Sequence, residues 1–397
     1  MIRQRLSDMD AGNALRTHRL LLRIALAAGN IFAWIFVFEH FYIIDNGNVA
    51  VALARVALLY ALSQTVTALL TPYTARGLRH GMRREIIYGV LFAAAAFIFL
   101  GAIFDGLFGM YYALAMVAFA LLLGAYRALY WVPYEVERNE MQARPAGLSR
   151  EILIALMPAF AGYLLSFDGV HEAWLLFGVG GVMIFSIIPF IRIPDVYEGF
   201  IWGYRETFGQ LFARAHRRLF WGAVIDGIQG AALLLIWPLV IFLIVGWAYP
   251  LFGLLLSFTF LLLIVARDSI QHLLRRMRVF DSLPVRVAIV SSAWIGRILV
   301  VNPVSVVVVD AYMHTSDPKI STDNVAFEQV SDGGHFIDHY TALREIGLSI
   351  GRIALCFVVA ALAGIVPLVF VFGTTFVIAG VCAGLSVLLS SGAKPSI

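Results

Sequence analysis

Long apolar runs separated by short polar breaks cover almost the whole chain. Most of these runs have about 17–25 residues, the length that an α-helix needs to cross a bilayer. The pattern therefore predicts six membrane spans, a polar stretch and six further spans. The predicted spans are 21–44, 49–70, 86–104, 109–132, 150–167, 172–192, 219–244, 249–267, 284–300, 303–315, 339–362 and 367–390.

The ninth and tenth spans are the least regular of the twelve. Together they occupy only residues 284–315, and the tenth is short for a full crossing. The tenth span either continues into the following "YMHTSD" or is discontinuous.

The polar breaks also predict the domain organisation. Two six-helix bundles, 21–192 and 219–390, flank a central loop at 193–218. A cytoplasmic N-terminal segment, 1–20, precedes the first bundle, and a cytoplasmic tail, 391–397, follows the second. The first segment has no apolar core and no small-residue cleavage pattern, so we do not expect a cleaved signal peptide.

The composition indicates the same class of protein. The 397 residues are 61% hydrophobic and 14% charged, whereas soluble domains have about 45–50% and about 25%. We therefore predict an all-α integral membrane protein. Cys356 and Cys382 both lie inside apolar runs, where we expect small buried hydrophobic residues rather than a disulfide.

The placement of charge predicts the orientation in the membrane. The 29 Lys and Arg residues lie in alternate loops or inside the spans. The remaining loops carry Asp45, Asp105 and Asp168 and no basic residue. The positive-inside rule then places both termini and the central loop in the cytoplasm. A different number of spans would disturb this alternation, so the charges favour twelve.

Two short sequence motifs of the first half recur in the second half. "HGMRR" at His80–Arg84 returns as "HLLRR" at His272–Arg276, and "REI" at Arg150–Ile152 returns at Arg344–Ile346. The similar spacing of the two recurring motifs suggests a six-helix unit used twice in parallel orientation. "REI" also occurs at Arg84–Ile86. The preference for acidic residues in a first helical turn could therefore produce it without repetition.

The layout of six plus six spans with a basic central loop resembles the major facilitator superfamily, over about residues 15–392. The family motif between helices 2 and 3, G-x-x-x-D-R-x-G-R-R, aligns with "TARGLRHGMR" at Thr74–Arg83. The matching residues are Arg79, Gly81 and Arg83, and Arg84 follows directly. The chain departs from the motif at Thr74, at Leu78, which replaces the aspartate, and at Met82. The resemblance implies a conformational loop here.

A second motif and two longer stretches also carry the resemblance. "MPAFAG" at Met157–Gly162 shares Pro158 and Gly162 with the helix 5 motif of family antiporters, where they allow a kink and close helix approach. "YWVPYE" at Tyr130–Glu135 and "DHYTALREIGLSIGR" at Asp338–Arg352 are similar to a bacterial branch of the superfamily. The resemblance implies a monomer in the bacterial inner membrane that acts on a small molecule.

In this family helices 1, 4, 7 and 10 line a central cavity. Ionisable groups inside a membrane usually face a cavity or a partner. The candidates for substrate binding or ion coupling on these helices are Glu39, His40, Arg127, Tyr130, Trp131, Asp226, Gln229, Trp237 and Asp310. Each has a structural alternative, as a satisfied ion pair or as packing. Asn30 is expected to form an interhelical hydrogen bond, and Asn302 lies at the edge of its span.

Similar depth along the predicted spans suggests three ion pairs. Glu39 and Arg55 lie eight residues to either side of Gly47, which favours a structural pair within the first bundle. Arg127 and Asp226 could meet across the cleft between the bundles, as a gate or a binding site.

The third pair would join Arg297 to Asp310, which flank the turn between the ninth and tenth spans. Arg352 lies midway along the eleventh span and is an alternative partner of Asp310. Asp310 could instead be a proton or substrate site.

Other chemistry has little support in the sequence. His335 and His339 have a spacing that could hold a metal on a helix, but the surrounding loop offers no further strong ligand set. No P-loop, G-x-S-x-G or H-E-x-x-H motif occurs. We therefore predict no metal, no cofactor, no enzymatic activity and no nucleic-acid partner.

The combined prediction is a secondary active transporter that moves a small solute by alternating access. Proton coupling and efflux both remain open, with Glu39, Asp226 and Asp310 as the acidic candidates for coupling. The few charges and many aromatic residues favour a moderately apolar solute. The alternative is a non-transporting membrane scaffold or assembly factor with the same fold.

Overall fold

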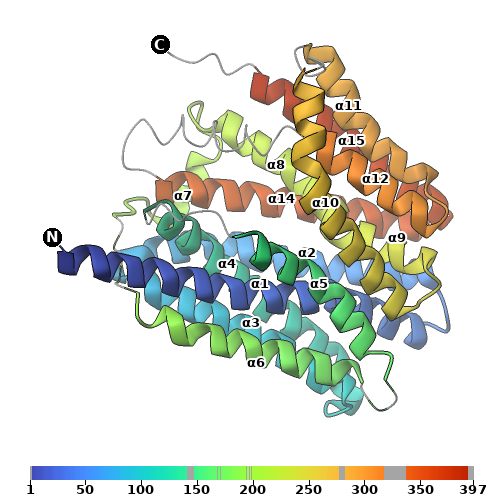
Figure 1. Cartoon of the computed structure of the whole chain (residues 1–397). Coiled ribbons are helices and arrows are strands. Elements are labelled where there is room, and N and C mark those ends of the chain that lie inside the picture. Colours follow the sequence, from blue (N-terminus) through green and yellow to red (C-terminus); the bar gives the residue numbers. More distant parts are fainter. Residues whose placement is uncertain are drawn as a thin grey trace.

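A computed structural model shows the chain as a bundle of helices (Figure 1). The structure describes residues 2–140, 147–167, 169, 171–193, 195, 197, 199–276, 282–316 and 337–391. The first half of the chain lies in the lower part of Figure 1 and the second half in the upper part.

Six helices form the N-terminal half. Two of the turns between them contain a short 3₁₀ segment, η1 (Leu78–His80) and η2 (Gly109–Tyr111). The helices are α1 (Ile2–Ile44), α2 (Val49–Gly77), α3 (Met82–Phe104), α4 (Tyr112–Glu140), α5 (Leu148–Leu164) and α6 (Glu172–Phe190).

The C-terminal half follows a short helix of the central loop, α7 (Tyr204–Gln210). Its first membrane helix is interrupted by a π-helical turn, η3 (Ala232–Ile236), and the third ends in a 3₁₀ segment, η4 (Gly296–Leu299). The helices are α8 (Arg217–Ala231), α9 (Trp237–Ile244), α10 (Tyr249–Arg276), α11 (Leu283–Ile295), α12 (Pro303–Ser316), α14 (Ile337–Ala363) and α15 (Leu368–Ser391).

Every predicted span falls on helical structure, which confirms the all-α class. In the described part of the chain, eight helices are long and apolar enough to cross a membrane. The number of crossings, twelve, therefore stays a prediction. The tenth span continues into "YMHTSD" as far as Ser316. α1 begins at Ile2, so the predicted N-terminal segment is continuous with the first span, and Leu15 and His18 are already buried.

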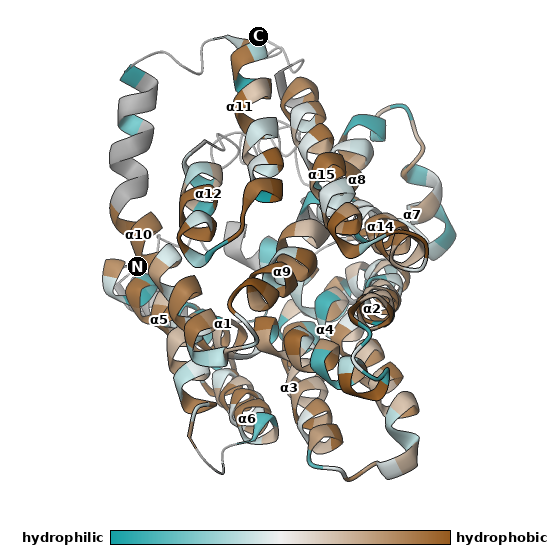
Figure 2. Ribbon diagram, turned by 90° about the vertical axis from the view of Figure 1, so that its right-hand side faces the viewer, coloured by the Kyte–Doolittle hydropathy of each residue, from teal (hydrophilic) through white to brown (hydrophobic). Residues whose placement is uncertain are grey.

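The outward faces of the helices are apolar. α3 exposes Leu91, Phe92 and Ile98, and α6 exposes Phe185 and Ile188. Hydrophobic residues predominate along most of the helices in Figure 2. Such a continuous apolar surface is typical of a protein whose outer face meets lipid tails.

The two ends of the bundle differ, and we name each after its connections. The hairpin end holds the turns 45–48 and 245–248, and the central-loop end holds 78–81 and 199–203. At the hairpin end, Asn48 caps α2, because its side chain accepts hydrogen bonds from the backbone N–H groups of Ala50 and Val51.

The most extensive packing between the halves is that of α2 along α14 and of α5 along α10. In the second pair the backbones approach closely, because a Cβ added at Gly162 would lie 2.3 Å from the carbonyl oxygen of Tyr249. A Cβ added at Gly253 would lie 2.1 Å from that of Pro158. The Ala159 N–H donates to Ser257 Oγ across the same contact, at 2.8 Å. Pro158 and Gly162 therefore do allow close helix approach.

Candidate functional site

A group of buried polar side chains lies where α14 meets α2 and α4. We call it the junction cluster: Tyr60, Ser63 and Gln64 of α2, Tyr126 and Arg127 of α4, and Ser349 and Arg352 of α14. All except Arg127, which is half-buried, are at most 6% exposed. Since α14 belongs to the C-terminal half, the cluster is built by both halves.

One hydrogen bond crosses the boundary between the halves inside this cluster. Arg352 Nη1 donates to Gln64 Oε1 at 3.1 Å. The same guanidinium lies against α8, where a Cβ added at Gly230 would be 3.6 Å from Arg352 Nε. Arg352 thus touches helices of both halves.

The sequence of α2 explains why its polar side chains reach this place. Polar residues recur every three or four positions, at Tyr60, Gln64, Thr67, Thr71 and Thr74, which places them on one face of a helix. The threonine hydroxyls donate to carbonyl oxygens one turn earlier on α2. Gln64 differs from the threonines, because its side-chain nitrogen donates to Ser63 Oγ at 3.3 Å while its side-chain oxygen accepts from Arg352 of the other half.

The largest effect of a neighbouring charged group on Arg352 is repulsive. Arg127 and Arg344 repel its guanidinium, whereas the Tyr60 hydroxyl and Glu345, two turns earlier on α14, attract it. Like charges in a medium of low dielectric constant interact far more strongly than in water.

Several polar atoms of the cluster have no hydrogen-bond partner among the described residues. They are the hydroxyls of Tyr60, Tyr126 and Ser349 and the Nε atoms of Arg127 and Arg352. Native proteins pair more than about 90% of their buried polar groups. A concentration of unpaired donors at one place therefore marks a candidate binding site.

A second buried arginine has a different environment, within the C-terminal half. Arg297 Nη2 donates to Asp310 Oδ1 at 2.9 Å, and Trp237 Nε1 donates to the same carboxylate at 2.9 Å. The Arg297 guanidinium also lies over the rings of Trp237 and Trp294, 4.8 and 4.5 Å from their centroids. The predicted Arg297–Asp310 pair is confirmed. Trp237 and Asp310, two of the predicted site residues, are therefore already bonded to each other, and Asp310 is also bonded to Arg297.

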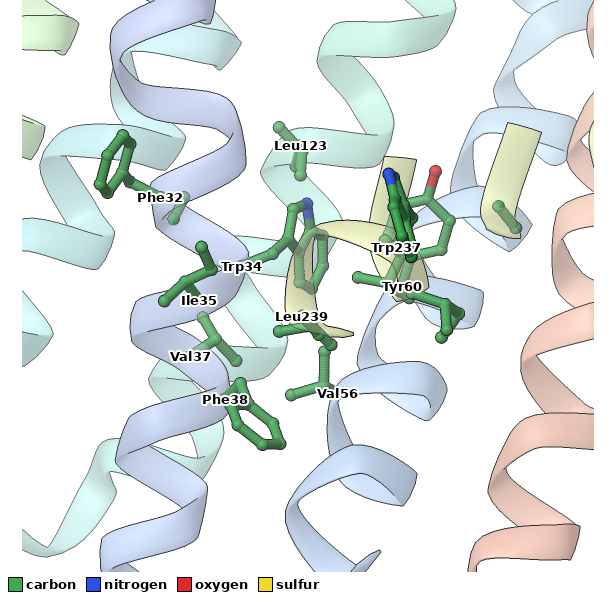
Figure 3. Packing of buried hydrophobic residues seen from close by; sticks show 14 of the residues in the cluster. Phe32, Trp34, Ile35, Val37, Phe38, Val56, Tyr60, Leu123, Trp237 and Leu239 are labelled. Carbon is green, nitrogen blue, oxygen red and sulfur yellow. The ribbon is translucent and has the colours of Figure 1, made fainter. Parts of the chain in front are cut away.

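The hairpin end is closed by aromatic contacts between the halves. Phe38 stacks on Trp247 with 5.6 Å between ring centroids, and Phe36 meets the edge of Tyr249 at 5.5 Å. Glu39 accepts a hydrogen bond from the Tyr249 hydroxyl of α10. Nearby buried residues of α1, α2, α4 and α9 form one hydrophobic cluster, which Figure 3 shows with Trp34, Val56 and Leu239 among its members.

The predicted Glu39–Arg55 pair is wrong in its partner. Arg55 pairs with Asp45 in the turn before α2, at 2.8 Å, and so remains a structural ion pair. Glu39 is directed to Tyr249 of the other half. The two side chains point in different directions around their helices, which similar depth along the spans does not reveal.

The predicted Arg127–Asp226 pair is not among the ion pairs of the described residues. Asp226 Oδ1 accepts from Ser386 Oγ of α15 at 3.1 Å, and Gln229 lies beside it at 3.4 Å. The reason is the rotation of α8. Gly227 faces α14, where an added Cβ would lie 2.2 Å from the carbonyl oxygen of Leu348. Asp226, one residue earlier, points about 100° away.

Three further candidates lie inside the N-terminal half. The Tyr130 hydroxyl lies 3.3 Å from His18 Nε2. Trp131 packs edge-on against the ring of Tyr130, with 5.4 Å between centroids. His40 packs against the rings of Phe104 and Tyr112. In these contacts the three side chains serve helix packing within one half.

At the central-loop end, the predicted conformational loop binds the chain that follows α6. Arg83 donates its backbone N–H to Asp195 Oδ1 at 3.0 Å and its guanidinium to the carbonyl oxygen of Ile193 at 3.2 Å. Arg79 donates to the carbonyl oxygen of Phe200. Gly81 has φ +111°, and a Cβ there would collide with Asp195. Arg84 instead lies over Tyr88 of its own helix.

The same segment also touches the C-terminal half. Phe200 stacks on His339 of α14, with 4.4 Å between centroids, and the Ile201 N–H donates to His339 Nε2 at 3.2 Å. His335, the other residue of the metal alternative, lies outside the described residues, as do Asp168 and the tail beyond 391.

Sequence reasoning missed Gln64, Tyr249 and Asp195. The polar stripe of α2 was a usable signal for Gln64, because such a stripe has no reason to face lipid. Tyr249 and Asp195 offer no comparable signal, since each acts on a residue more than a hundred positions away. The two-fold hydrogen bond from Arg23 to Glu151, at 2.6 and 2.8 Å, was also not predicted.

No protein-family model matches the sequence, and a comparison with curated proteins found no match. Solved structures with the same fold include a mutant of the peptide transporter POT, which is 13% identical with a TM-score of 0.58. That similarity covers 96% of this chain and 93% of the other. The nucleoside transporter NupG is also 13% identical, with a TM-score of 0.56, and covers 96% and 97% of the two chains. The expected fold of the major facilitator superfamily is therefore confirmed.

Proposed function

We propose that this protein is a secondary active transporter that carries a small solute across a membrane by alternating access. The observation that carries the proposal is the junction cluster, in which both halves contribute buried polar groups to one place. The hydrogen bond from Arg352 to Gln64 joins the halves there. A site shared by two rocking halves can be exposed to either side in turn.

The contacts at the two ends support this mechanism. The hairpin end is held by stacked aromatic side chains and by the bond from Tyr249 to Glu39. The central-loop end is held by the segment that bonds to Arg83 and stacks on His339. The described contacts at the two ends are separate from one another, so each set can break while the other holds.

Orientation, coupling and cellular location are parts of the same proposal. We assign the central-loop end and both termini to the cytoplasm, which the positive-inside distribution supports, and the protein to a bacterial inner membrane, which the family resemblance implies. Glu39 is the acidic residue best placed for proton coupling, because its hydrogen bond joins the halves. Asp310 is less suited, since Arg297 and Trp237 already occupy it. The protein acts as a monomer, without metal or cofactor.

Cross-linking at the hairpin end tests alternating access. Cys356 and Cys382 are first replaced by alanine, and cysteines are then introduced at Phe38 and Trp247, whose rings are stacked. Oxidation should abolish solute flux into proteoliposomes, and reduction should restore it. The matched control places cysteines at Tyr163 and Phe167, an exposed aromatic pair within one half, where cross-linking should leave flux unchanged.

The outcome separates transport from the scaffold alternative. Flux is screened with labelled solutes of different charge, with and without a pH gradient. Flux that persists in the oxidised Phe38→Cys/Trp247→Cys protein overturns alternating access. An absence of flux for every solute with every gradient favours a scaffold.

A further inference from the structure

We propose that Arg127 and Arg352 together bind an anionic group, a carboxylate or a phosphate-type oxyanion, of the transported solute. This inference rests on the proposed function and specifies the chemical class of the solute. It replaces the expectation of a moderately apolar compound with one that carries at least one negative charge.

The charge of the junction is the first argument. Arg352 is 6% exposed and repelled by Arg127, and its one described side-chain hydrogen bond goes to the neutral Gln64 rather than to a carboxylate. A buried positive charge is costly unless it is paired. A negatively charged ligand between the two guanidiniums would supply the compensation that the described protein groups do not.

The supply of donors is the second argument. Arg352 uses Nη1 to reach Gln64, and its Nε has no described partner. Arg127 Nε and the hydroxyls of Tyr60, Tyr126 and Ser349 are also unpaired. All of these atoms carry a proton that they can donate, whereas a carboxylate or phosphate only accepts hydrogen bonds. Guanidinium groups bind such anions with two parallel hydrogen bonds.

The two arginines belong to different halves, so anion binding between them affects how the halves approach each other. Arg127 belongs to α4 in the N-terminal half and Arg352 to α14 in the C-terminal half. Without an anion their repulsion opposes close approach of the halves. A bound anion reverses the sign of this interaction, so that binding favours the closed state through which the solute must pass.

Thermal unfolding of the purified full-length protein in detergent tests the charge argument without a known solute. Arg127→Gln should unfold at the same temperature as the wild type or a few degrees higher, because the substitution removes repulsion and no described hydrogen bond. If Arg127 instead had a structural role, the unfolding temperature would fall by several degrees, and that result would overturn the proposal.

Ligand binding provides the second measurement. Inorganic phosphate and succinate are titrated against sodium chloride of equal ionic strength, tetraethylammonium chloride and mannitol. At least one oxyanion should raise the unfolding temperature of the wild type beyond the salt control. Arg127→Gln and Arg352→Gln should each raise at least tenfold the oxyanion concentration that is needed for the same rise in unfolding temperature. Arg76→Gln, at an exposed arginine on α2, should leave that concentration unchanged.

Three results distinguish failure of this inference from failure of the proposed function. Equal effects of the oxyanions on the wild type and on Arg127→Gln/Arg352→Gln overturn the anion site. Flux of a neutral or cationic solute that survives both substitutions keeps the transporter and rejects the anion. Saturable oxyanion binding without flux of any solute keeps the anion site and rejects transport.

Discussion

Two buried arginines, Arg297 and Arg352, are both nearly inaccessible to solvent but have opposite surroundings. Arg297 lies within one half, bonded to Asp310 and covered by the rings of Trp237 and Trp294. Arg352 lies between the halves, bonded to the neutral Gln64 and repelled by Arg127. The charge of Arg297 is compensated by Asp310 of the same half, although its Nε and Nη1 have no described hydrogen-bond partner. The described hydrogen bond of Arg352 goes to a neutral side chain and does not compensate its charge.

The comparison shows how a buried charge can be assigned a role. A paired arginine within a rigid half stabilises that half and has little reason to interact with a solute. An arginine that has no carboxylate partner at the junction between the halves lowers the stability of the empty protein, and natural proteins tend to retain such a destabilising group where function needs it. The predictions below test this distinction.

The largest effect is expected from Asp310→Ala. The substitution leaves Arg297 buried without a carboxylate, which typically costs about 3–5 kcal/mol. Thermal or denaturant unfolding of the purified protein measures the loss, and Val308→Ala, at an exposed site of the same helix, is the control. The double variant Arg297→Met/Asp310→Leu should recover most of the stability. A double variant as unstable as Asp310→Ala would show that the ion pair is not the cause.

A smaller effect of opposite sign is expected from Gln64→Glu. This substitution places a carboxylate where the Gln64 oxygen accepts from Arg352 at 3.1 Å, and thereby gives Arg352 the kind of partner that Arg297 has. We expect a gain of about 1–2 kcal/mol in the free energy of unfolding, from replacing a neutral by a charge-assisted hydrogen bond.

The same variant should lose oxyanion binding and transport, because the new carboxylate competes for both guanidiniums. Gln64→Met, which has no acceptor, should be less stable than the wild type. A Gln64→Glu protein that is destabilised and still binds oxyanions would contradict the proposed charge imbalance.

Trp237→Phe should cost about 1 kcal/mol, because it removes one hydrogen bond to Asp310 and keeps most of the buried ring. Unfolding measurements against Trp221→Phe, at an exposed site of α8, isolate this contribution. Oxyanion binding should be unchanged. Lost binding with retained stability would move Trp237 from the structural cluster to the binding site.

The smallest effect is expected from Arg55→Gln at the hairpin end. Its pair with Asp45 is partly exposed, with 43% of the Arg55 side chain accessible. Exposed ion pairs contribute about 0–1 kcal/mol. A shift in unfolding temperature as large as that of Asp310→Ala would mean that burial does not decide how much an ion pair of these arginines contributes to stability.

Of the predicted side-chain pairs, the one closest together in the sequence was predicted correctly, whereas the pair between distant helices was not. Arg297 and Asp310 are thirteen residues apart beside one short turn, and their pairing was predicted correctly. Arg127 and Asp226 were matched by depth alone and lie in different environments. Depth fixes the height of a side chain along the bundle, whereas contact also requires the two helices to present the same faces to one another.

The sequence by itself determined the helical class, the positions of the apolar segments and the turns between them. These properties depend on hydrophobicity, helix length and capping, which act over a few residues. Only the tertiary structure decided that Arg352 meets Gln64 while Arg297 meets Asp310. The rotation and close packing of each helix set those partners, and they depend on small residues such as Gly227 and Gly253 at contacts between distant segments.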